Sequence, residues 1–213
     1  MSLRIVIADD QSELRSAYRM VIDAQPDMTV VGEAADGAAA VHLARRLRPD
    51  VVVADVRMPK LDGLEVTRQL AGPGADPAIR VLVVTTFDVD EDVHAALRNG
   101  ACGFLLKRSG PTLLVEAIRA AAAGDVLISP QLTARLLRHV SRAPVPIPEP
   151  ALSPRELLVA ELVARGLTNA QVAAELHLAV GTVKNLVATV SSKLDVRNRV
   201  GIAMWVWNRR GQS

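Results

Sequence analysis

Five side chains with chemical potential stand directly after apolar runs of the sequence: Asp9, Asp10, Asp55, Thr85 and Lys107. Carboxylates that lie close together repel one another and raise their own pKa values. A divalent cation such as Mg²⁺, which prefers hard oxygen ligands, removes that penalty. A carboxylate can also attack phosphorus and form an aspartyl phosphate, if nearby groups neutralise the charge on the phosphoryl oxygens. The ammonium of Lys107 and the hydroxyl of Thr85 suit that supporting role.

The elements that must position these side chains alternate between strand and helix patterns. Apolar, β-rich runs predict five strands, at 3–8, 28–34, 51–54, 79–84 and 102–106. Helical patterns occur at about 11–24, 37–48, 63–71, 90–99 and 111–123. This alternation predicts an α/β fold of the flavodoxin-like (βα)5 type, with a five-stranded parallel sheet covered on both faces. Because ligands bind beyond the carboxyl ends of such strands, we expect the five side chains to converge at one edge.

The chain changes character after the last of these units. Residues 1–125 carry 14 basic and 18 acidic side chains, a net charge of −4, whereas residues 126–213 carry 11 and five, a net charge of +6. A helical pattern and then a Pro-rich spacer, APVPIPEPALSP, lie between the two parts. We therefore expect a first domain over 1–124, a helical then Pro-rich linker over 125–150, and a second domain over 151–213. The positive charge of the second part indicates an anionic partner.

The second domain carries only helical signals. The stretches SPRE (153–156) and TNAQ (168–171) match a capping box, in which the first and last residues cap a helix start reciprocally. A longer helix is expected over 182–194, and a last helix at about 198–209. A short helix, a tight turn and a longer helix within a basic, all-α unit of four helices predict a helix-turn-helix.

The first domain resembles a known family of signalling domains. The motifs ADDQ (8–11), DVRMPKLDG (55–63), VVTTF (83–87) and GFLLK (103–107) make residues 1–124 similar to the receiver domain of two-component response regulators. Receiver domains have the (βα)5 fold that the pattern predicts. The resemblance also implies a partner, a cognate histidine kinase that supplies the phosphoryl group.

The resemblance to receiver domains implies a role for each residue at the strand ends. Asp55 would be the phosphoacceptor, and Thr85 and Lys107 would bind the phosphoryl group. Thr85 and Phe104 would act as switch residues. The resemblance also implies a Mg²⁺ site, formed by Asp9, Asp10, Asp55 and the backbone carbonyl of Arg57. In this site Asp10 would be the direct ligand, and Asp9 would assist. One departure from the family is Arg108, which stands where a proline usually follows the lysine.

The second domain resembles the LuxR-type helix-turn-helix that ends regulators of the NarL/FixJ type, over residues 152–199. This resemblance and the positive charge together predict binding to double-stranded DNA. Near the start of the helix at 182–194, Lys184 could reach guanine and Asn185 could reach adenine. Phosphate contacts are expected from four further residues: Thr182, Lys193, Arg197 and Arg199. Ala179 stands where the family commonly has a Ser or Thr cap, a loss of about 1 kcal/mol.

The expected last helix has an apolar stripe formed by Ile202, Trp205 and Val206. Such a stripe is more typical of a domain core than of an interface. In the family that the sequence resembles, however, the last helix commonly pairs two DNA-binding domains. The three residues are therefore candidates for a dimer contact, in a homodimer that forms on phosphorylation.

The leading hypothesis is a phosphorylation-controlled DNA-binding transcription regulator, and not an enzyme. A sensor kinase would phosphorylate Asp55 and thereby promote dimerisation and promoter binding. One alternative is a regulator that binds DNA without phosphorylation, although the complete set of strand-end residues argues against it. Another is a phosphatase with an Asp nucleophile, but Arg57 occupies the place of the second carboxylate in an Asp-x-Asp pair. A nucleotide-binding Rossmann protein is disfavoured because no Gly-rich turn follows the first strand.

Composition narrows the setting in which the protein works. No apolar run approaches the ~18 residues that span a membrane, and Asp9 and Asp10 interrupt the apolar start of the chain, which argues against a signal peptide. Cys102 is the only cysteine, so an intrachain disulfide is impossible. We expect a cytoplasmic protein without a membrane partner. The Pro-rich linker allows both a closed arrangement, in which the first domain covers the helix at 182–194, and an open one.

Overall fold

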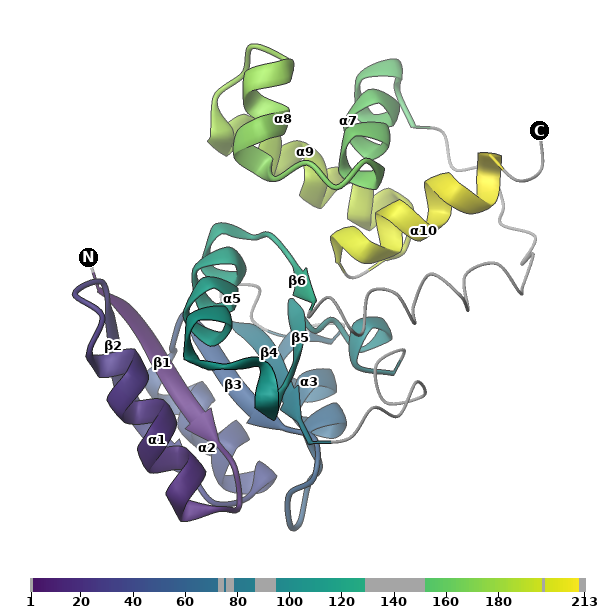
Figure 1. Cartoon of the computed structure of the whole chain (residues 1–213). Helices are drawn as coiled ribbons and strands as arrows, with labels where there is room; N and C mark the ends of the chain where they lie inside the picture. The colour runs from purple at the N-terminus through teal and green to yellow at the C-terminus, as the bar shows by residue number, and fades with distance from the viewer. Residues whose placement is uncertain are drawn as a thin grey trace.

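The first domain is a parallel sheet between two layers of helices (Figure 1). The computed structural model describes residues 2–72, 75, 79–86, 95–128, 152–196 and 198–210. The strands are β1 (Leu3–Ala8), β2 (Met28–Ala34), β3 (Val51–Asp55), β4 (Arg80–Thr85), β5 (Gly103–Leu106) and β6 (Leu127–Ile128). The helices are α1 (Ser12–Asp23), α2 (Gly37–Leu47), α3 (Gly63–Ala71) and α5 (Pro111–Ala123), with a 3-10 turn η1 (Lys107–Ser109).

The strand order is β2-β1-β3-β4-β5-β6, and every neighbouring pair is parallel. This order confirms the predicted α/β class and places β1 beside β3. In register, Ala8 pairs with Ala54, the residue before Asp55, and Thr85 pairs with Leu106, the residue before Lys107. The ends of four strands therefore lie along one edge of the sheet. The two-residue strand β6 is an addition to the five strands that the sequence predicts.

Both faces of the sheet are buried, which explains why its strands are almost continuously apolar. Alternate residues of β1 enter different cores, with Ile5 and Ile7 on one face and Val6 and Ala8 on the other. Helices α1 and α5 cover the face of Ile5, and helices α2 and α3 cover the face of Val6. Every residue of β3 is buried. The apolar run before Asp55 is therefore a central strand.

A close backbone approach fixes helix α3 directly behind the end of β3. The backbone nitrogen of Gly63 donates a hydrogen bond to the Val56 carbonyl, at 2.9 Å. A Cβ on Gly63 would lie 2.1 Å from the carbonyl oxygen of Asp55, so only glycine fits there. The side chain of Asp62 caps the helix by accepting a hydrogen bond from the backbone nitrogen of Glu65. Residues 56–62 are therefore held as a compact loop next to Asp55.

The second domain consists of four helices, α7 (Pro154–Ala164), α8 (Asn169–Glu175), α9 (Val180–Lys193) and α10 (Arg199–Arg210). Both predicted capping boxes are present, at Ser153 and at Thr168. Helix α9 begins without a side-chain cap, because Ala179 has no group to accept the hydrogen bond. Its buried residues Val183 and Val190 pack toward α7 and α8. The turn between α8 and α9 completes the predicted helix-turn-helix arrangement.

Some sequence predictions fall partly or wholly outside the described residues. The helix expected at 90–99 is described only from residue 95, and residues 95–98 are helical. The helical and Pro-rich linker expected over 125–150 is described only up to Ile128, which ends β6. Within the part of the chain that the structure describes, no helix is long and apolar enough to cross a membrane.

Glu156 links the start of α7 to the end of α9. Its carboxylate accepts hydrogen bonds from the backbone nitrogen of Ser153 and from the ammonium of Lys193, both at 2.7 Å. The hydrogen bond from Lys193 is the main cause that lowers the pKa of Glu156 to about 2, and the Ser153 amide adds to it. The ionised carboxylate therefore stabilises the folded domain above pH 4.5, and this contribution is lost as the pH falls toward 2.

We predict that Glu156→Gln lowers the stability of the second domain at pH 7. The difference from wild type shrinks as the pH falls from about 4.5 to about 2, because the wild-type carboxyl is then protonated as well. Urea denaturation followed by tryptophan fluorescence, repeated between pH 7 and pH 3, measures this difference. Glu161→Gln is the matched control, since it removes a carboxylate from the same helix and leaves the cap intact. A difference that does not change with pH would contradict the prediction.

Candidate functional site

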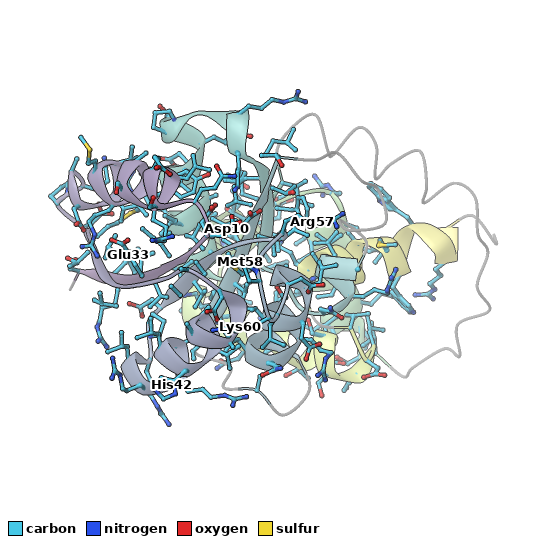
Figure 2. All side chains as sticks on the ribbon, turned by 90° about the horizontal axis from the view of Figure 1, so that it is seen from below. Asp10, Glu33, His42, Arg57, Met58 and Lys60 are labelled. Carbon is cyan, nitrogen blue, oxygen red and sulfur yellow. The ribbon has the colours of Figure 1, made fainter. Side chains whose placement is uncertain are left out.

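Three carboxylates gather at the carboxyl edge of the sheet. Asp9 and Asp10 follow β1, and Asp55 ends β3, the neighbouring strand. One carboxylate oxygen from each of the three lies within 4.8 Å of the others. Asp9 and Asp55 are buried, whereas Asp10 is exposed at the edge, beside the loop of Arg57 and Met58 (Figure 2). The structure therefore brings together the three acidic residues that the sequence analysis placed in one site.

Lys107 forms ion pairs with both buried carboxylates. Its ammonium nitrogen lies 2.7 Å from Oδ2 of Asp9 and 2.9 Å from Oδ2 of Asp55. Only 6 % of its side chain is exposed. The other oxygen of Asp9 accepts a hydrogen bond from the backbone nitrogen of Gln11, at 3.0 Å. A cation from the end of β5 thus joins the ends of β1 and β3.

Burial and charge act against each other in this pocket. Burial raises the pKa of Asp55, and the hydrogen bond and positive charge of Lys107 limit the rise. The backbone nitrogen of Arg57 also favours the ionised carboxylate by hydrogen bonding to it. For Lys107, burial opposes the charged form, but its hydrogen bonds to Asp9 and Asp55 outweigh burial and raise the pKa. Lys107 is therefore a fixed cation beside Asp55.

Thr85 and Phe104 occupy the neighbouring strands. Thr85 is the last residue of β4 and is buried, one residue beyond the position that pairs with Asp55. Phe104 lies in β5, where it pairs with Val83 and is fully buried in the core next to α2 and α3. Thr85 is thus at the strand end that the sequence predicts, and Phe104 lies within the neighbouring strand, three residues before Lys107. Their roles as switch residues remain predictions.

A hollow of about 420 Å³ opens next to the carboxylates. It is lined by the exposed Asp10 and by the loop after β3, with Arg57, Met58 and Pro59 among its walls. Mg²⁺ takes carboxylate and carbonyl oxygens and keeps several waters, so a site with a few oxygen ligands that opens to solvent suits it. The donor set of Asp9, Asp10 and Asp55 therefore fits this ion. Arg57 and Asp10 line the same hollow, so the carbonyl of Arg57 is a candidate ligand.

Five of the six residues predicted to contact DNA fall into three groups. Thr182, Lys184 and Asn185 are exposed in the first turns of α9. Lys193, at the end of the same helix, is 42 % exposed and paired with Glu156. Arg197 lies outside the described residues.

The structure places Arg199 in an ion pair within the chain, so its contact with DNA stays a prediction. This residue begins α10 but is 9 % exposed, and its guanidinium is paired with Asp125 and donates to the carbonyl of Leu167. Burial lowers the pKa of Arg199, and the charge of Asp125 opposes that shift. A buried guanidinium that is already paired has no surface for a DNA phosphate in this arrangement. No sequence pattern pointed to Asp125 as a partner, because the two residues are 74 positions apart.

The structure corrects the predicted dimer contacts. Ile202, Trp205 and Val206 are 0 %, 6 % and 3 % exposed, because they pack against α7 and α9 in the core of their own domain. Residues so deeply buried leave no surface for a second chain. The more common meaning of such an apolar stripe, a domain core, is therefore the right one here. Trp207 on the same helix is 38 % exposed.

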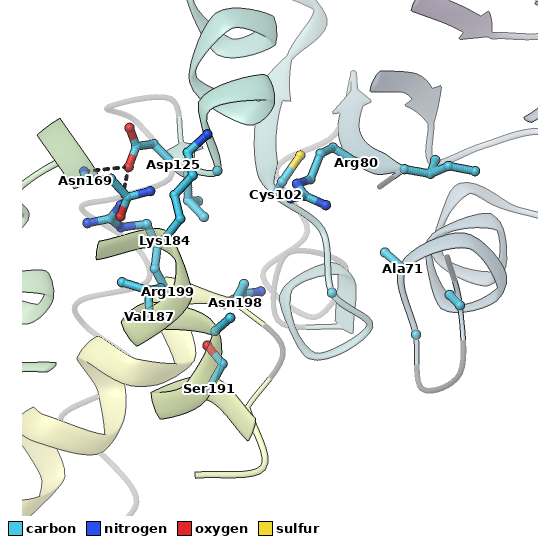
Figure 3. A pocket seen from close by; sticks show the side chains of 17 residues that line it. Ala71, Arg80, Cys102, Asp125, Asn169, Lys184, Val187, Ser191, Asn198 and Arg199 are labelled. Atoms are coloured by element: carbon cyan, nitrogen blue, oxygen red, sulfur yellow. Dashed lines mark hydrogen bonds and ion pairs between the residues drawn. The ribbon is translucent and has the colours of Figure 1, made fainter. Parts of the chain in front are cut away.

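The two domains contact each other through the start of α10 and the end of α5. Asp125 accepts hydrogen bonds from Arg199 and from the backbone nitrogen of Asn169, the latter at 3.1 Å. Figure 3 shows these three residues joined, with Lys184 of α9 beside them. The side-chain nitrogen of Asn198 donates to the carbonyl of Leu97 at 2.7 Å and to that of Ala101 at 3.2 Å. The second domain is therefore docked on the segments on either side of β5.

Helix α9 faces the first domain in this arrangement. A cavity of about 380 Å³ lies between the domains, and its walls include Lys184, Val187 and Ser191 of α9. The opposite wall includes Arg80 and Cys102 of the first domain (Figure 3). The side of α9 that carries Lys184 thus faces the first domain across this cavity, although the Lys184 side chain itself is exposed. Sequence reasoning left this arrangement open, and the structure shows the closed form.

Comparison with known proteins agrees with these observations. A family model for the response regulator receiver domain matches residues 5–119. A second model, for bacterial regulatory proteins of the luxR family, matches residues 150–206. The chain belongs to the LuxR-family response regulators. As a response regulator with a LuxR-type helix-turn-helix, it is a DNA-binding transcription regulator.

Relatives of this response regulator share both domains. The uncharacterized transcriptional regulatory protein YxjL of Bacillus subtilis is 38% identical over 202 residues, covering 92% of this chain and 91% of its own. The nitrate/nitrite response regulator protein NarL of Escherichia coli is 36% identical over 208 residues, covering 97% and 95%. A crystal structure of the response regulator ChrA, from a heme-sensing two-component system, has 35% identity and a TM-score of 0.55 over 98% of both chains.

We predict that Asp125→Ala opens this response regulator. The change removes the carboxylate that holds Arg199 and Asn169 against the first domain. We expect a larger radius of gyration in small-angle X-ray scattering and at least about fivefold tighter binding to a DNA duplex of random sequence. Asp27→Ala is the control, because it breaks a pair with Arg119 inside the first domain. Unchanged DNA affinity in the Asp125 variant would show that the closed arrangement does not restrict binding.

Proposed function

We propose that this response regulator controls transcription through phosphorylation of Asp55 by a histidine kinase. The observation that carries the proposal is the geometry of the nucleophile. Asp55 ends a fully buried strand, lies 2.9 Å from a buried ammonium, and directly precedes Val56, which lines an open hollow that a phosphodonor can enter. A solubilising aspartate on a turn would have none of these three properties.

The proposed reaction is transfer of a phosphoryl group to a carboxylate. An oxygen of Asp55 attacks the phosphorus of a phosphohistidine on the kinase, a P–O bond forms, and the P–N bond breaks with its electron pair leaving on the imidazole. Lys107 neutralises charge on the transferred group, and the hydroxyl of Thr85 donates a hydrogen bond to it. Mg²⁺ would supply further positive charge at the phosphoryl oxygens. Asp10, Asp55 and the Arg57 carbonyl would hold the ion, with Asp9 assisting.

The same pocket offers a physical route to the second domain. A phosphoryl group on Asp55 gives Lys107 and Thr85 a new anionic partner, and both residues border β5. Strand β5 carries Phe104 and begins two residues after Ala101, whose carbonyl accepts a hydrogen bond from Asn198 of the second domain. Phosphorylation then favours whichever arrangement of these strand ends binds the phosphoryl group better. We infer that this arrangement is the open one, in which α9 is free.

In the open form, the start of α9 enters the major groove of DNA. Lys184 and Asn185 reach base edges, and Thr182 contacts phosphate together with Lys193 and Arg197. Arg199 becomes available to phosphate only after it leaves Asp125. A homodimer on phosphorylation would place two such helices on paired half-sites.

We predict that beryllofluoride with Mg²⁺ converts the wild-type protein into a dimer and leaves Asp55→Asn monomeric. Beryllofluoride occupies the place of the phosphoryl group on an aspartate, so its effect requires that carboxylate. Light scattering coupled to size-exclusion chromatography measures the mass of each sample. Omission of Mg²⁺ provides the metal-removal control and should also leave the wild type monomeric. If both proteins respond alike, binding of DNA without phosphorylation becomes the better hypothesis.

We predict that Lys184→Met weakens DNA binding and lowers its salt dependence. If Lys184 contacts a guanine, the variant should lose about 1–3 kcal/mol of binding free energy at its preferred site. If Lys184 contacts phosphate, the slope of log affinity against log salt concentration should fall by about one unit. Fluorescence anisotropy at several salt concentrations separates the two roles. Arg165→Met is the charge-matched control, because Arg165 is exposed at the end of α7. Equal effects of the two variants would exclude a specific role for α9.

A further inference from the structure

The guanidinium of Arg15 lies next to the acidic site and has no role in the phosphoryl transfer proposed above. Arg15 of α1 donates from Nη1 to the carbonyl oxygen of Asp9 at 2.7 Å and to that of Asp10 at 3.3 Å. Its side chain is 17 % exposed. The two carbonyls belong to the consecutive residues whose carboxylates form the metal site. Arg15 therefore contacts the backbone that carries these carboxylates, and not the carboxylates themselves.

Arg15 is held in place by Glu33 of β2. Nε of Arg15 lies 3.4 Å from one carboxylate oxygen of Glu33, and the other oxygen accepts a hydrogen bond from Arg19 (Glu33 is labelled in Figure 2). Glu33 pairs with Ile7 in the sheet, so its own position is fixed by the strand. The guanidinium of Arg15 is thus tied to the rigid sheet on one side and to the turn between β1 and α1 on the other.

The turn between β1 and α1 needs such a support. Helix α1 begins at Ser12, and its N-cap residue Gln11 makes no side-chain capping hydrogen bond. Besides the contacts of Arg15 and the ion pair of Asp9 with Lys107, this turn is held by hydrogen bonds from Asp9 N to the Ala34 carbonyl, at 3.1 Å, and from Gln11 N to Asp9 Oδ1, at 3.0 Å. Both act at Asp9, and neither restrains the carbonyl of Asp10. A charge-assisted hydrogen bond from Arg15 reaches that carbonyl as well.

We propose that Arg15 is a positioning residue for Mg²⁺ binding. By holding the carbonyls of Asp9 and Asp10, it fixes the direction in which the two carboxylates project, one toward Lys107 and the other toward the open edge. The inference rests on the proposed Mg²⁺ site and adds a residue to it. Groups that orient metal ligands commonly change metal affinity by tenfold or more when they are removed.

The sign of the effect separates positioning from simple electrostatics. Arg15 carries a positive charge, which repels a divalent cation bound a few ångströms away. If Arg15 acted only through its charge, its removal would strengthen Mg²⁺ binding. If it acts by orienting the carboxylates, its removal weakens Mg²⁺ binding despite the relief of repulsion. The two explanations therefore predict changes of opposite direction.

Arg19 provides a matched control on the same helix. It binds the same carboxylate of Glu33, lies four residues further along α1, and also donates to Asp23 and to the carbonyl of Val30. Among the contacts that the structure describes for Arg19, none involves Asp9 or Asp10. Arg19→Met therefore removes the same charge and the same kind of ion pair while leaving the turn supported.

We predict that Arg15→Met raises the Mg²⁺ dissociation constant of the full-length protein about tenfold, measured by isothermal titration calorimetry. Arg19→Met should stay within about twofold of wild type. Arg15→Lys should lie between them, because one ammonium can reach a carbonyl but lacks the planar fork. Thermal unfolding of each variant shows whether a general loss of stability accompanies the change.

A second readout separates metal binding from chemistry. With acetyl phosphate as donor, the Mg²⁺ concentration that gives half the maximal phosphorylation rate should rise in Arg15→Met, while the rate at saturating Mg²⁺ stays near that of wild type. Mn²⁺ electron paramagnetic resonance should show a matching loss of bound ion. A merely structural role would lower the rate at all metal concentrations.

The outcomes also separate this inference from the proposed site. If wild type binds Mg²⁺ and Asp10→Asn does not, the site stands. An unchanged or lower dissociation constant for Arg15→Met then overturns the role of Arg15 alone, as does an equal loss in Arg19→Met. If wild type fails to bind Mg²⁺, or Asp10→Asn binds it equally well, the metal site and the role of Arg15 fall together.

Discussion

The ion pairs of Lys107 with Asp9 and Asp55 are the interactions on which the rest of the molecule depends. Two carboxylates that are 1 % and 5 % exposed cannot stay ionised next to each other without a compensating charge. Lys107 supplies that charge from a different strand, at distances below 3 Å. The pairs therefore require that β1, β3 and β5 end level with one another. The strand order, the parallel registers and the burial of both sheet faces all serve that alignment.

The same constraint explains why the very apolar strand β3 ends on a charged residue, Asp55. A central parallel strand has both faces covered, so its side chains are apolar until the strand reaches the edge. At the edge, Gly63 lets the backbone of α3 approach the Asp55 carbonyl, and the loop that follows opens a hollow for a donor. Asp55, the proposed nucleophile, is thus partly desolvated, which raises its pKa, and yet stands at the start of a loop that borders an open hollow. A group with both properties suits reversible transfer better than a fully exposed or a fully buried carboxylate.

Sequence patterns predicted the features that depend on local residue order and on where strands and helices end. The strands, the helices that flank them and the convergence of Asp9, Asp55 and Lys107 follow from apolar periodicity and the edge rule for parallel sheets. The Arg199 contact was not predictable, because its partner is 74 positions away and a cation at a helix start is typical of both DNA contacts and ion pairs. The stripe of Ile202 and Trp205 was similarly ambiguous, since cores and interfaces share the same helical period. The contact of Arg15 with the turn after β1 was not predictable either, because its partners are backbone carbonyls. Every residue has a backbone carbonyl, so the residue types do not show which one accepts the hydrogen bond.

The closed position of α9 has a consequence for what DNA itself does to the protein. In the proposed switch, the first domain and a DNA duplex compete for the same face of α9, and phosphorylation weakens the first competitor. Thermodynamic linkage is reciprocal, so a duplex that captures α9 must also favour the receiver conformation that binds the phosphoryl group. A promoter would then act as an effector of the receiver as well as its target. Protein bound at a good site would become phosphorylated to a greater extent than free protein at the same level of phosphodonor.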